Sequence, residues 1–432
     1  MKRIVIGSIV AGALLVAAAV PAQAGRRPRP SDVPAGQAVS VLAPNQFQLY
    51  NDYATDARTF SSRRAVVHYV VVGIDAPPLN DDDSDGVPDY VERVALAADG
   101  AIDYYERRGF AHILADEAGP DARPDLYVSR FAPGYFGVAF PAAQASGGGF
   151  VVVSNALDPS PERSLGSLYG TVAHELFHLV QFSYFRRTVD PAIPGWALEG
   201  TAAAMEGRVY AQLADIVSSL QLRSWFDQPQ ASLTEQTYGS QLLWRYLDER
   251  RPRLLPGYFH WLATRRPGKS AAAGLAATYE RMSGQPFPPA FGRFATWVAG
   301  EYAALLTPLQ TLVTDTRTRG RLEPLSIHYL RVPHSAVALR VRVTEGRPTV
   351  ALVYEHLSAY AGRAAVTRRL PGREANGAVV FRIPPSLRHS PRFGPATLVV
   401  ANGDPCRPGA YSVAVGRNTP DDRDKRTTKG AA

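Results

Sequence analysis

The sequence predicts an α+β protein, in which a mainly helical domain with a small mixed sheet is followed by a C-terminal antiparallel β-sandwich. Apolar positions recur at helical spacing from about Leu165 to Leu306. After about Thr318 the pattern changes to short β-branched and aromatic runs separated by Gly, Pro and Asn, which is typical of a sandwich. The chain has 432 residues, of which 46% are hydrophobic and 20% charged, so two or three globular domains are expected.

The first segment has the three-part layout of a secretory signal peptide. Two basic residues precede an apolar run over residues 4–20, which ends in the small-residue sequence Ala22-Gln23-Ala24. A membrane anchor is the alternative, but the run is shorter than the ~20 residues that span a bilayer. We therefore expect cleavage after Ala24, a secreted extracellular protein, and no membrane span.

The elements of the first domain follow in order. Residues 25–60 are rich in Pro, Arg and Gly, and we expect a flexible leader or short pro-segment. The domain at 61–317 then opens with a β-branched strand over Ala65–Val72 and a helix over Tyr90–Arg108. The same patterns predict strands over Asp125–Phe131 and Phe150–Ser154, and helices over Leu168–Phe185, Trp196–Leu213, Tyr238–Glu249, Gly257–Thr264, Ala271–Met282 and Ala290–Leu305. The stretch Gly147–Ala156 is either an edge strand on which a peptide substrate pairs or an ordinary core strand.

The sandwich domain is expected at 318–417. Its predicted strands cover Ser326–Val332, Ala336–Val343, Thr349–Tyr354, Ala378–Ile383, Ala396–Ala401 and Tyr411–Val415. This domain would bind substrate, contact a surface or polymer, or only stabilise the protein. The charged tail at 418–432 lacks large apolar residues and is expected to be disordered.

Composition excludes several classes of protein. A single cysteine excludes a disulfide scaffold and any cysteine-based zinc finger. The formal net charge is +8, but the arginines are scattered among acidic residues and form no periodic stripe. We therefore expect no nucleic-acid partner.

The most informative motif is the H-E-x-x-H sequence at 174–178, inside an apolar helical stretch. Residues four apart on an α-helix lie about 40° apart around its axis, so His174 and His178 can aim their rings at one point. Imidazole nitrogens are favoured zinc ligands. Glu175 is rotated by about 100° from His174, which places it to reach a metal-bound water as the general base.

A catalytic zinc of this kind needs a third protein ligand and an open fourth position. The segment Trp196–Ala202 carries Glu199 on a second predicted helix, and the small residues around it would let the two helices approach closely. Glu206 lies two turns further along the same face and is the alternative. We prefer Glu199.

An acidic loop at 81–92 has the ligand spacing of an EF-hand. Positions 1, 3, 5, 7, 9 and 12 of the loop are Asp81, Asp83, Asp85, Val87, Asp89 and Glu92, with Val87 contributing its carbonyl. A hard cation would relieve the repulsion among these carboxylates, so we expect one structural Ca²⁺. A solvated acidic turn is the alternative.

The set of His174, Glu175, His178 and Glu199 resembles that of the gluzincin zinc metalloproteases, the thermolysin-like group. More closely, the chain resembles a family of exported bacterial metalloproteases that combine four segments. These are a D-x-D-x-D-G-x-P-D-x-x-E loop, H-E-x-x-H-x-x-Q, W-x-x-E-G-x-A and a C-terminal β-sandwich, and they match Asp81–Glu92, His174–Gln181, Trp196–Ala202 and the region after Thr318.

The resemblance implies a zincin-like domain with zinc held by His174, His178 and Glu199. It also implies that Glu175 is the catalytic base. Metzincins place a third histidine on a glycine turn, but the equivalent positions here hold Gln181 and Tyr184, which excludes that class. Two departures from gluzincins matter: Ala203 replaces the aspartate that orients a ligand histidine, and the aminopeptidase motif G-x-M-E-N is absent, which favours an endopeptidase.

Two functions remain open at this stage. The first is a secreted zinc metallopeptidase acting on a peptide or protein substrate. The second is a secreted, calcium-stabilised binding or adhesion protein with a structural or inactive zinc centre. A structural zinc has no use for Glu175, so the first is favoured.

Overall fold

The structure, a computed structural model, is mixed α+β and divides into two compact units. It describes residues 29, 56–114, 121–131, 135–141, 148–159, 167–185, 193–210, 225–265, 268–303, 305–356, 368–388 and 393–416. The first unit spans residues 1–222 and 244–266, and the second spans 223–243 and 267–432. The predicted signal peptide, nearly all of the leader and the tail lie outside the described residues. No helix among those that are described has the length and apolar character to cross a membrane.

The first unit contains a mixed five-stranded sheet in the order β1-β2-β3-β5-β4. Strands β2, β3 and β5 run parallel, and β1 and β4 pair antiparallel at the two edges. The strands are β1 (Arg58–Ser61), β2 (Val66–Tyr69), β3 (Asp125–Ser129), β4 (Gly137–Pro141) and β5 (Gly149–Ser154). Strand β5 lies between β3 and β4, and every one of its residues is buried. The edge-strand interpretation of Gly147–Ala156 is therefore wrong, and β4 takes the edge.

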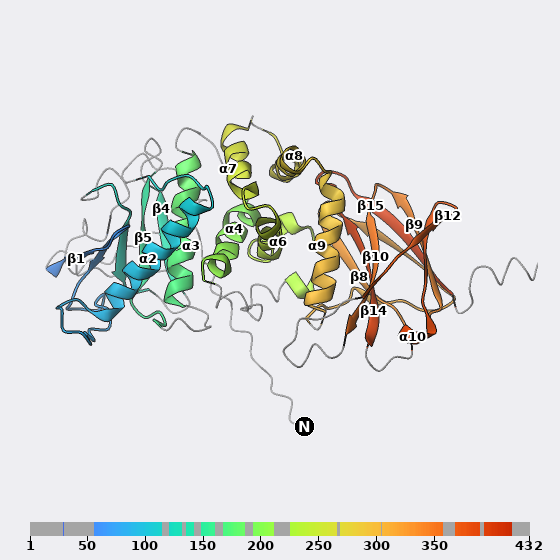
Figure 1. Ribbon diagram of the computed structural model, residues 1–432, viewed down its shortest axis with the longest axis horizontal. Coiled ribbons are helices and arrows are strands. Elements are labelled where there is room, and N and C mark those ends of the chain that lie inside the picture. The colour runs from blue at the N-terminus through green and yellow to red at the C-terminus, as the bar shows by residue number, and fades with distance from the viewer. Residues whose placement is uncertain are drawn as a thin grey trace, which may run out of the picture. The chain divides into compact units, whose positions relative to one another are not determined.

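Two long helices lie side by side against this sheet (Figure 1), α2 (Asp89–Arg107) and α3 (Leu168–Phe185). The Tyr90 hydroxyl donates to the carbonyl of Ser154 on β5 at 2.6 Å, and the Tyr105 hydroxyl donates to the carbonyl of Ala173 on α3, also at 2.6 Å. Both hydroxyls belong to α2. These buried hydrogen bonds fix α2 against the sheet and against α3.

The helix α4 (Gly195–Val209) packs on α3 and is anchored at its start by a pair of tryptophans. Trp196 of α4 stacks on Trp244 of α6 (Gln241–Arg250) with ring centroids 5.1 Å apart. The Trp244 indole N–H donates to the carbonyl of Trp196 at 2.9 Å. Helix α7 (Leu254–Thr264) completes the described helices of this unit.

A buried arginine is fixed on the opposite face of the same sheet. Arg29 is 4% exposed and pairs with Asp125 at 3.1 Å. It also donates to the Tyr127 hydroxyl at 3.1 Å and lies over the ring of Phe150. His68 contacts the other oxygen of Asp125 at 2.8 Å. The buried charge of Asp125 is therefore paired on both oxygens, which offsets much of the cost of burying it.

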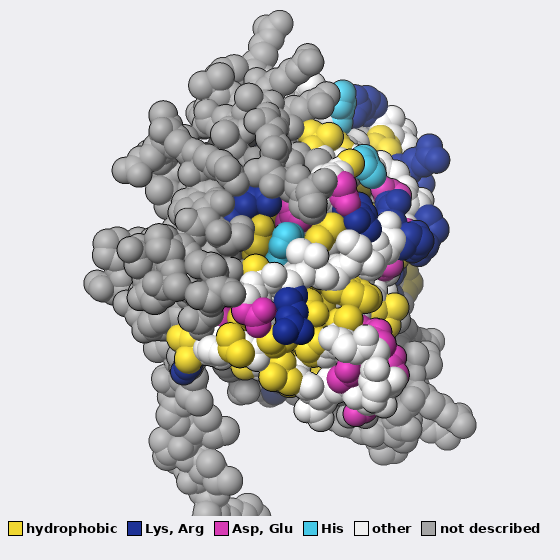
Figure 2. All heavy atoms as spheres, turned by 90° about the vertical axis from the view of Figure 1, so that its left-hand side faces the viewer, with side chains coloured by type: hydrophobic (Ala, Val, Ile, Leu, Met, Phe, Trp, Pro, Cys, Tyr) yellow, Lys and Arg dark blue, Asp and Glu magenta, His cyan; other side chains and the backbone are white. Residues whose placement is uncertain are grey.

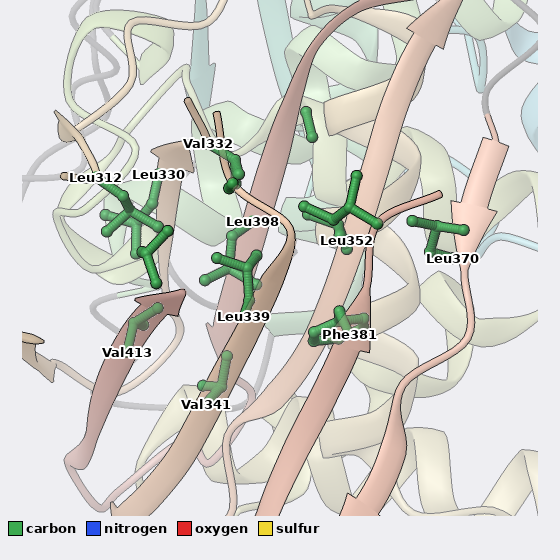
Figure 3. Close-up of a cluster of buried hydrophobic side chains, with 14 of the residues drawn as sticks. Leu312, Leu330, Val332, Leu339, Val341, Leu352, Leu370, Phe381, Leu398 and Val413 are labelled. Atoms are coloured by element: carbon green, nitrogen blue, oxygen red, sulfur yellow. The ribbon is translucent and has the colours of Figure 1, made fainter. Parts of the chain in front are cut away.

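The second unit contains two five-stranded sheets, ordered β11-β10-β14-β8-β6 and β12-β13-β9-β15-β7. All their strand pairs are antiparallel except β6 with β8. The strands are β6 (Gln310–Thr311), β7 (Arg317–Leu322), β8 (Ser326–Arg331), β9 (Ala338–Glu345), β10 (Thr349–His356), β11 (Arg368–Leu370), β12 (Arg373–Ala375), β13 (Ala378–Arg382), β14 (Phe393–Asn402) and β15 (Gly409–Gly416). Leu352 and Leu398 of one sheet and Leu339 and Phe381 of the other belong to one buried cluster (Figure 3).

Helices α8 (Ala271–Ser283) and α9 (Phe287–Glu301) group with these sheets. Helix α9 packs on β10 and β14, and Gly292 lies so close to Thr349 that a Cβ there would be 2.4 Å from its methyl carbon. Residues 267–317 therefore share a unit with the C-terminal strands, whereas the sequence placed them in the preceding domain. The short elements η5 (Leu233–Glu235) and α10 (Pro385–Arg388) complete this unit.

We predict that His328 makes the second unit sensitive to acid. Burial lowers the pKa of His328 to about 4, against about 6.5 in an unfolded chain. Between pH 6.5 and pH 4, His328 is therefore protonated in the unfolded chain but neutral in the folded one. Because protonation favours the unfolded chain, the free energy of unfolding falls by about 3 kcal/mol as pH drops from 6.5 to 4. Urea unfolding at several pH values should show this loss in the wild type and a smaller loss in His328→Gln. The exposed His334→Gln is the control, and equal acid sensitivity in all three proteins would contradict the prediction.

Candidate metal centre

Helix α3 brings two histidines together in a buried position. Of its 18 residues, 15 are buried, so the helix has no open side on which a polar residue could be solvated. His174 and His178, one turn apart, are 1% and 0% exposed, and their ring centroids are 4.8 Å apart. This is the arrangement that the four-residue spacing predicts.

Glu199 of α4 meets both imidazoles. Its Oε2 lies 3.3 Å from Nε2 of His174 and 3.7 Å from Nε2 of His178. One ligand atom from each of the three residues falls within 4.8 Å of the others, so the group could hold a metal ion. The small buried residues around Glu199, such as Gly200 and Ala203, let α4 approach α3 closely.

Glu206 lies on the other side of the first histidine and is not part of this group. Its Oε1 contacts Nδ1 of His174 at 2.7 Å, which turns Nε2 toward Glu199. Nδ1 of His178 likewise contacts Oε1 of Gln181 at 2.7 Å. Each ring is thus oriented by a partner on its Nδ1 side, as metal-ligating histidines usually are. Gln181 stands three residues after His178 on the same helix, a spacing at which two side chains lie on one face.

The charges in the group are strongly coupled. Burial alone would lower the pKa of His174, but its hydrogen bonds with Glu199 and Glu206 outweigh burial and raise that pKa well above its usual value. Burial would raise the pKa of Glu199, yet the two imidazoles reduce it to about 2. The two imidazoles therefore favour the ionised form of this carboxylate.

One buried nitrogen in the group has no hydrogen-bond partner. Nε2 of His178 is fully buried and makes no hydrogen bond with any residue that the structure describes. An orphaned buried polar atom is costly unless a ligand satisfies it. Two imidazole nitrogens and a carboxylate oxygen facing one point fit a borderline-soft divalent cation such as zinc.

Glu175 lies beside this group, next to the edge strand β4. A Cβ added to Gly137 at the start of β4 would lie 2.9 Å from Cγ of Glu175, so only glycine lets the strand pass so near. Glu175 is 1% exposed, and its Oε2 has no hydrogen-bond partner within the described part of the chain. Burial raises the pKa of its carboxyl group.

The acidic residues of the loop at 81–92 gather at the start of α2. Ligand atoms of Asp81, Asp83 and Asp85 lie within 4.8 Å of one another, and so do those of Asp83, Asp89 and Glu92. Asp83 belongs to both sets, which makes them one cluster. Figure 1 places this loop at the lower left, and Figure 2 shows acidic side chains gathered low on that side of the first unit.

The backbone of the loop is wrapped around its own carboxylates. Asp81 accepts hydrogen bonds from the amides of Asp85 at 3.2 Å and Gly86 at 2.9 Å. Gly86 has φ +92°, in the region that favours glycine. The amide of Val87 donates to Asp85 at 2.8 Å. Burial, followed by the neighbouring carboxylates, raises the pKa of Glu92.

Comparison with known proteins identifies no family for this chain. No protein-family model matches the chain, and no curated protein sequence does so either. The function must therefore be argued from the geometry of the site.

We predict that Glu206 supports metal binding without being a ligand. Glu206→Ala removes the partner of His174 Nδ1 and should weaken zinc affinity about 10–100-fold, as loss of such partners usually does. Competition with a chelator measures the affinity. The exposed Glu301→Gln should leave it unchanged. An affinity for Glu206→Ala equal to that of the wild type would contradict the role.

Proposed function

We propose that this chain is a secreted zinc metallopeptidase that hydrolyses peptide bonds in proteins. The observation that supports it most is the convergence of His174, His178 and Glu199 beside Glu175. In the same proposal, the first unit is zincin-like and the two sheets of the second unit form a β-sandwich. Export follows from the signal-peptide pattern of the sequence.

The proposed metal is zinc, held by two imidazoles and one carboxylate. Three protein ligands leave a fourth position open, which distinguishes catalytic from structural zinc sites. When bound, zinc would polarise the scissile carbonyl and lower the pKa of a coordinated water. The ionised Glu199 and the unsatisfied Nε2 of His178 supply what such an ion needs.

Glu175 is the proposed general base. It follows His174 directly, so the helix turns it about 100° away from the ligand direction. It would take a proton from the attacking water and pass it to the leaving amine. Among the described residues, none forms a hydrogen bond with its Oε2 that would compete with this task. A binding protein with a structural zinc would gain nothing from a buried carboxylate here, which disfavours the alternative function.

Strand β4 is the proposed guide for the substrate. It is the edge strand of the sheet as described, and its first residue, Gly137, lies so near Glu175 that a Cβ there would crowd the Glu175 side chain. An extended peptide can add to such an edge by main-chain hydrogen bonds. A peptide paired there would run past the proposed base, and this supports an endopeptidase that binds the substrate backbone.

We predict that Glu175→Gln abolishes cleavage and retains the metal. The amide keeps the shape of the side chain but cannot accept the proton, so cleavage of a denatured protein should fall at least about 100-fold. Zinc content should stay at that of the wild type, because Glu175 is not a ligand.

The control for this experiment is Glu301→Gln, which changes an exposed glutamate in the other unit. Equal cleavage by Glu175→Gln and the wild type would refute the mechanism. Cleavage by neither protein, with zinc bound to both, would favour the binding or adhesion function instead.

We also propose that the loop at 81–92 binds one structural Ca²⁺. The two sets of carboxylates share Asp83 and lie at the start of α2, so one cation would fasten the loop to the helix. This helix supports α3 through the hydroxyl of Tyr105. Calcium would therefore stabilise the centre without taking part in the reaction.

We predict that removing calcium lowers the melting temperature while zinc stays bound. A ligand present at 100 times its Kd stabilises a protein by about 2.7 kcal/mol, and calcium should act on the wild type in this way. In Asp81→Ala, added calcium should produce a smaller shift in melting temperature. Asp121→Ala, which changes an exposed aspartate outside the loop, should respond like the wild type. A calcium-independent melting temperature in the wild type would refute the site.

A further inference from the structure

We infer that Gln181 is a positioning residue that sets the tautomer of one metal ligand and the location of another. The inference deepens the proposed metal site and rests on that proposal for its functional meaning. Gln181 is 0% exposed, yet it lies outside the group of His174, His178 and Glu199. The oxygen and the NH₂ group of a fully buried amide both need hydrogen-bond partners, so the contacts of Gln181 show which way its amide points.

The direction of the amide is fixed by its partners on α4. Its NH₂ group lies 2.9 Å from the carbonyl oxygen of Leu198 and 2.8 Å from Oγ1 of Thr201. The Thr201 hydroxyl donates to the carbonyl of Ala197 at 2.6 Å, so its oxygen is left to accept. With the amide reversed, two carbonyl oxygens would face each other. The amide oxygen must therefore point to His178.

This orientation decides which nitrogen of His178 carries the proton. The amide oxygen lies 2.7 Å from Nδ1 and can only accept, so Nδ1 must be the N–H. A neutral imidazole has a single N–H, and Nε2 consequently holds a lone pair. Nε2 is the nitrogen that lies 3.7 Å from Oε2 of Glu199, and no side chain in the described ranges forms a hydrogen bond with it. Gln181 thus keeps His178 in its metal-binding form.

The same amide fixes the turn that carries Glu199. Leu198 and Thr201, its two acceptors, flank Glu199 on α4. Thr201 is 0% exposed, so no water competes for these hydrogen bonds. The side chain of Gln181 therefore fixes the distance between His178 on α3 and Glu199 on α4.

The chemistry explains why a glutamine stands here. Glu206 orients His174 with a carboxylate, which only has to accept a hydrogen bond. A carboxylate at position 181 could accept from His178 in the same way, but it could not donate to Leu198 or Thr201. Only a side chain with both an acceptor and donors performs both tasks.

The test measures the tautomer of His178 in the full-length, metal-free protein by ¹⁵N NMR of its ring, at a pH where the ring is neutral. We expect the Nδ1–H form in the wild type and its loss in Gln181→Met. Zinc affinity, measured by competition with a chelator, should fall about 10–100-fold in Gln181→Met. Gln228→Met changes an exposed glutamine and should alter neither quantity.

Gln181→Glu separates the two roles. It should retain the Nδ1–H form, since the carboxylate accepts, and still bind zinc more weakly than the wild type, since the Glu199 turn is released. An Nε2–H form of His178 in the wild type would overturn the inference, whether or not any variant folds. Wild-type zinc affinity in Gln181→Glu would overturn the role at Glu199. The tautomer is read without metal or substrate, so these results are independent of whether the chain is a peptidase.

Discussion

The close packing of α4 on α3 is the constraint on which the proposed centre depends. Two imidazoles and a carboxylate are held away from water, where an unpaired charge would be costly. The contacts of the carboxylate with the two imidazoles offset that cost, and so do the hydrogen bonds of Glu206 and Gln181 on the Nδ1 side of the rings. The small buried residues around Glu199 permit this short separation, and the stacked Trp196 and Trp244 hold the start of α4 against α6.

The sheet of the first unit places the same helix beside a strand edge. Tyr105 holds α2 to α3, and Gly137 lets β4 pass next to Glu175. The metal group, the proposed base and the strand edge are therefore positioned by one buried helix. A shift of α3 would disturb all three, which explains why so many buried contacts converge on it.

Much of the fold could be predicted because apolar spacing records which face of an element is buried. All predicted helices are present, with ends that differ by a few residues. Strand β7 was missed because arginines occupy alternate positions of Arg317–Leu322, so it has no apolar run. The grouping of α9 with the C-terminal sheets was missed because an apolar face does not identify the surface it packs on.

The sequence also allowed the ligands of the candidate centre to be predicted, but not every side chain that orients them. Spacing within one helix fixes His174 and His178, and the small residues around Glu199 indicate a close helix. The contact of Glu206 with His174 joins α4 to α3, so it depends on how the two helices are rotated against each other, and motif spacing does not contain that rotation. Gln181 lies three residues after His178 on the same helix, so this contact follows from spacing, whereas the hydrogen bonds of Gln181 to α4 emerged only from the structure.

X-ray absorption spectroscopy of the purified, zinc-loaded protein tests the central claim most directly, because it reports the atoms bound to the metal. A zinc ion held by His174, His178 and Glu199 should give one zinc per chain with only nitrogen and oxygen neighbours at about 2.0–2.2 Å, and with the scattering signature of two imidazoles. A protein that binds no zinc, or a spectrum without imidazole scattering, would contradict it.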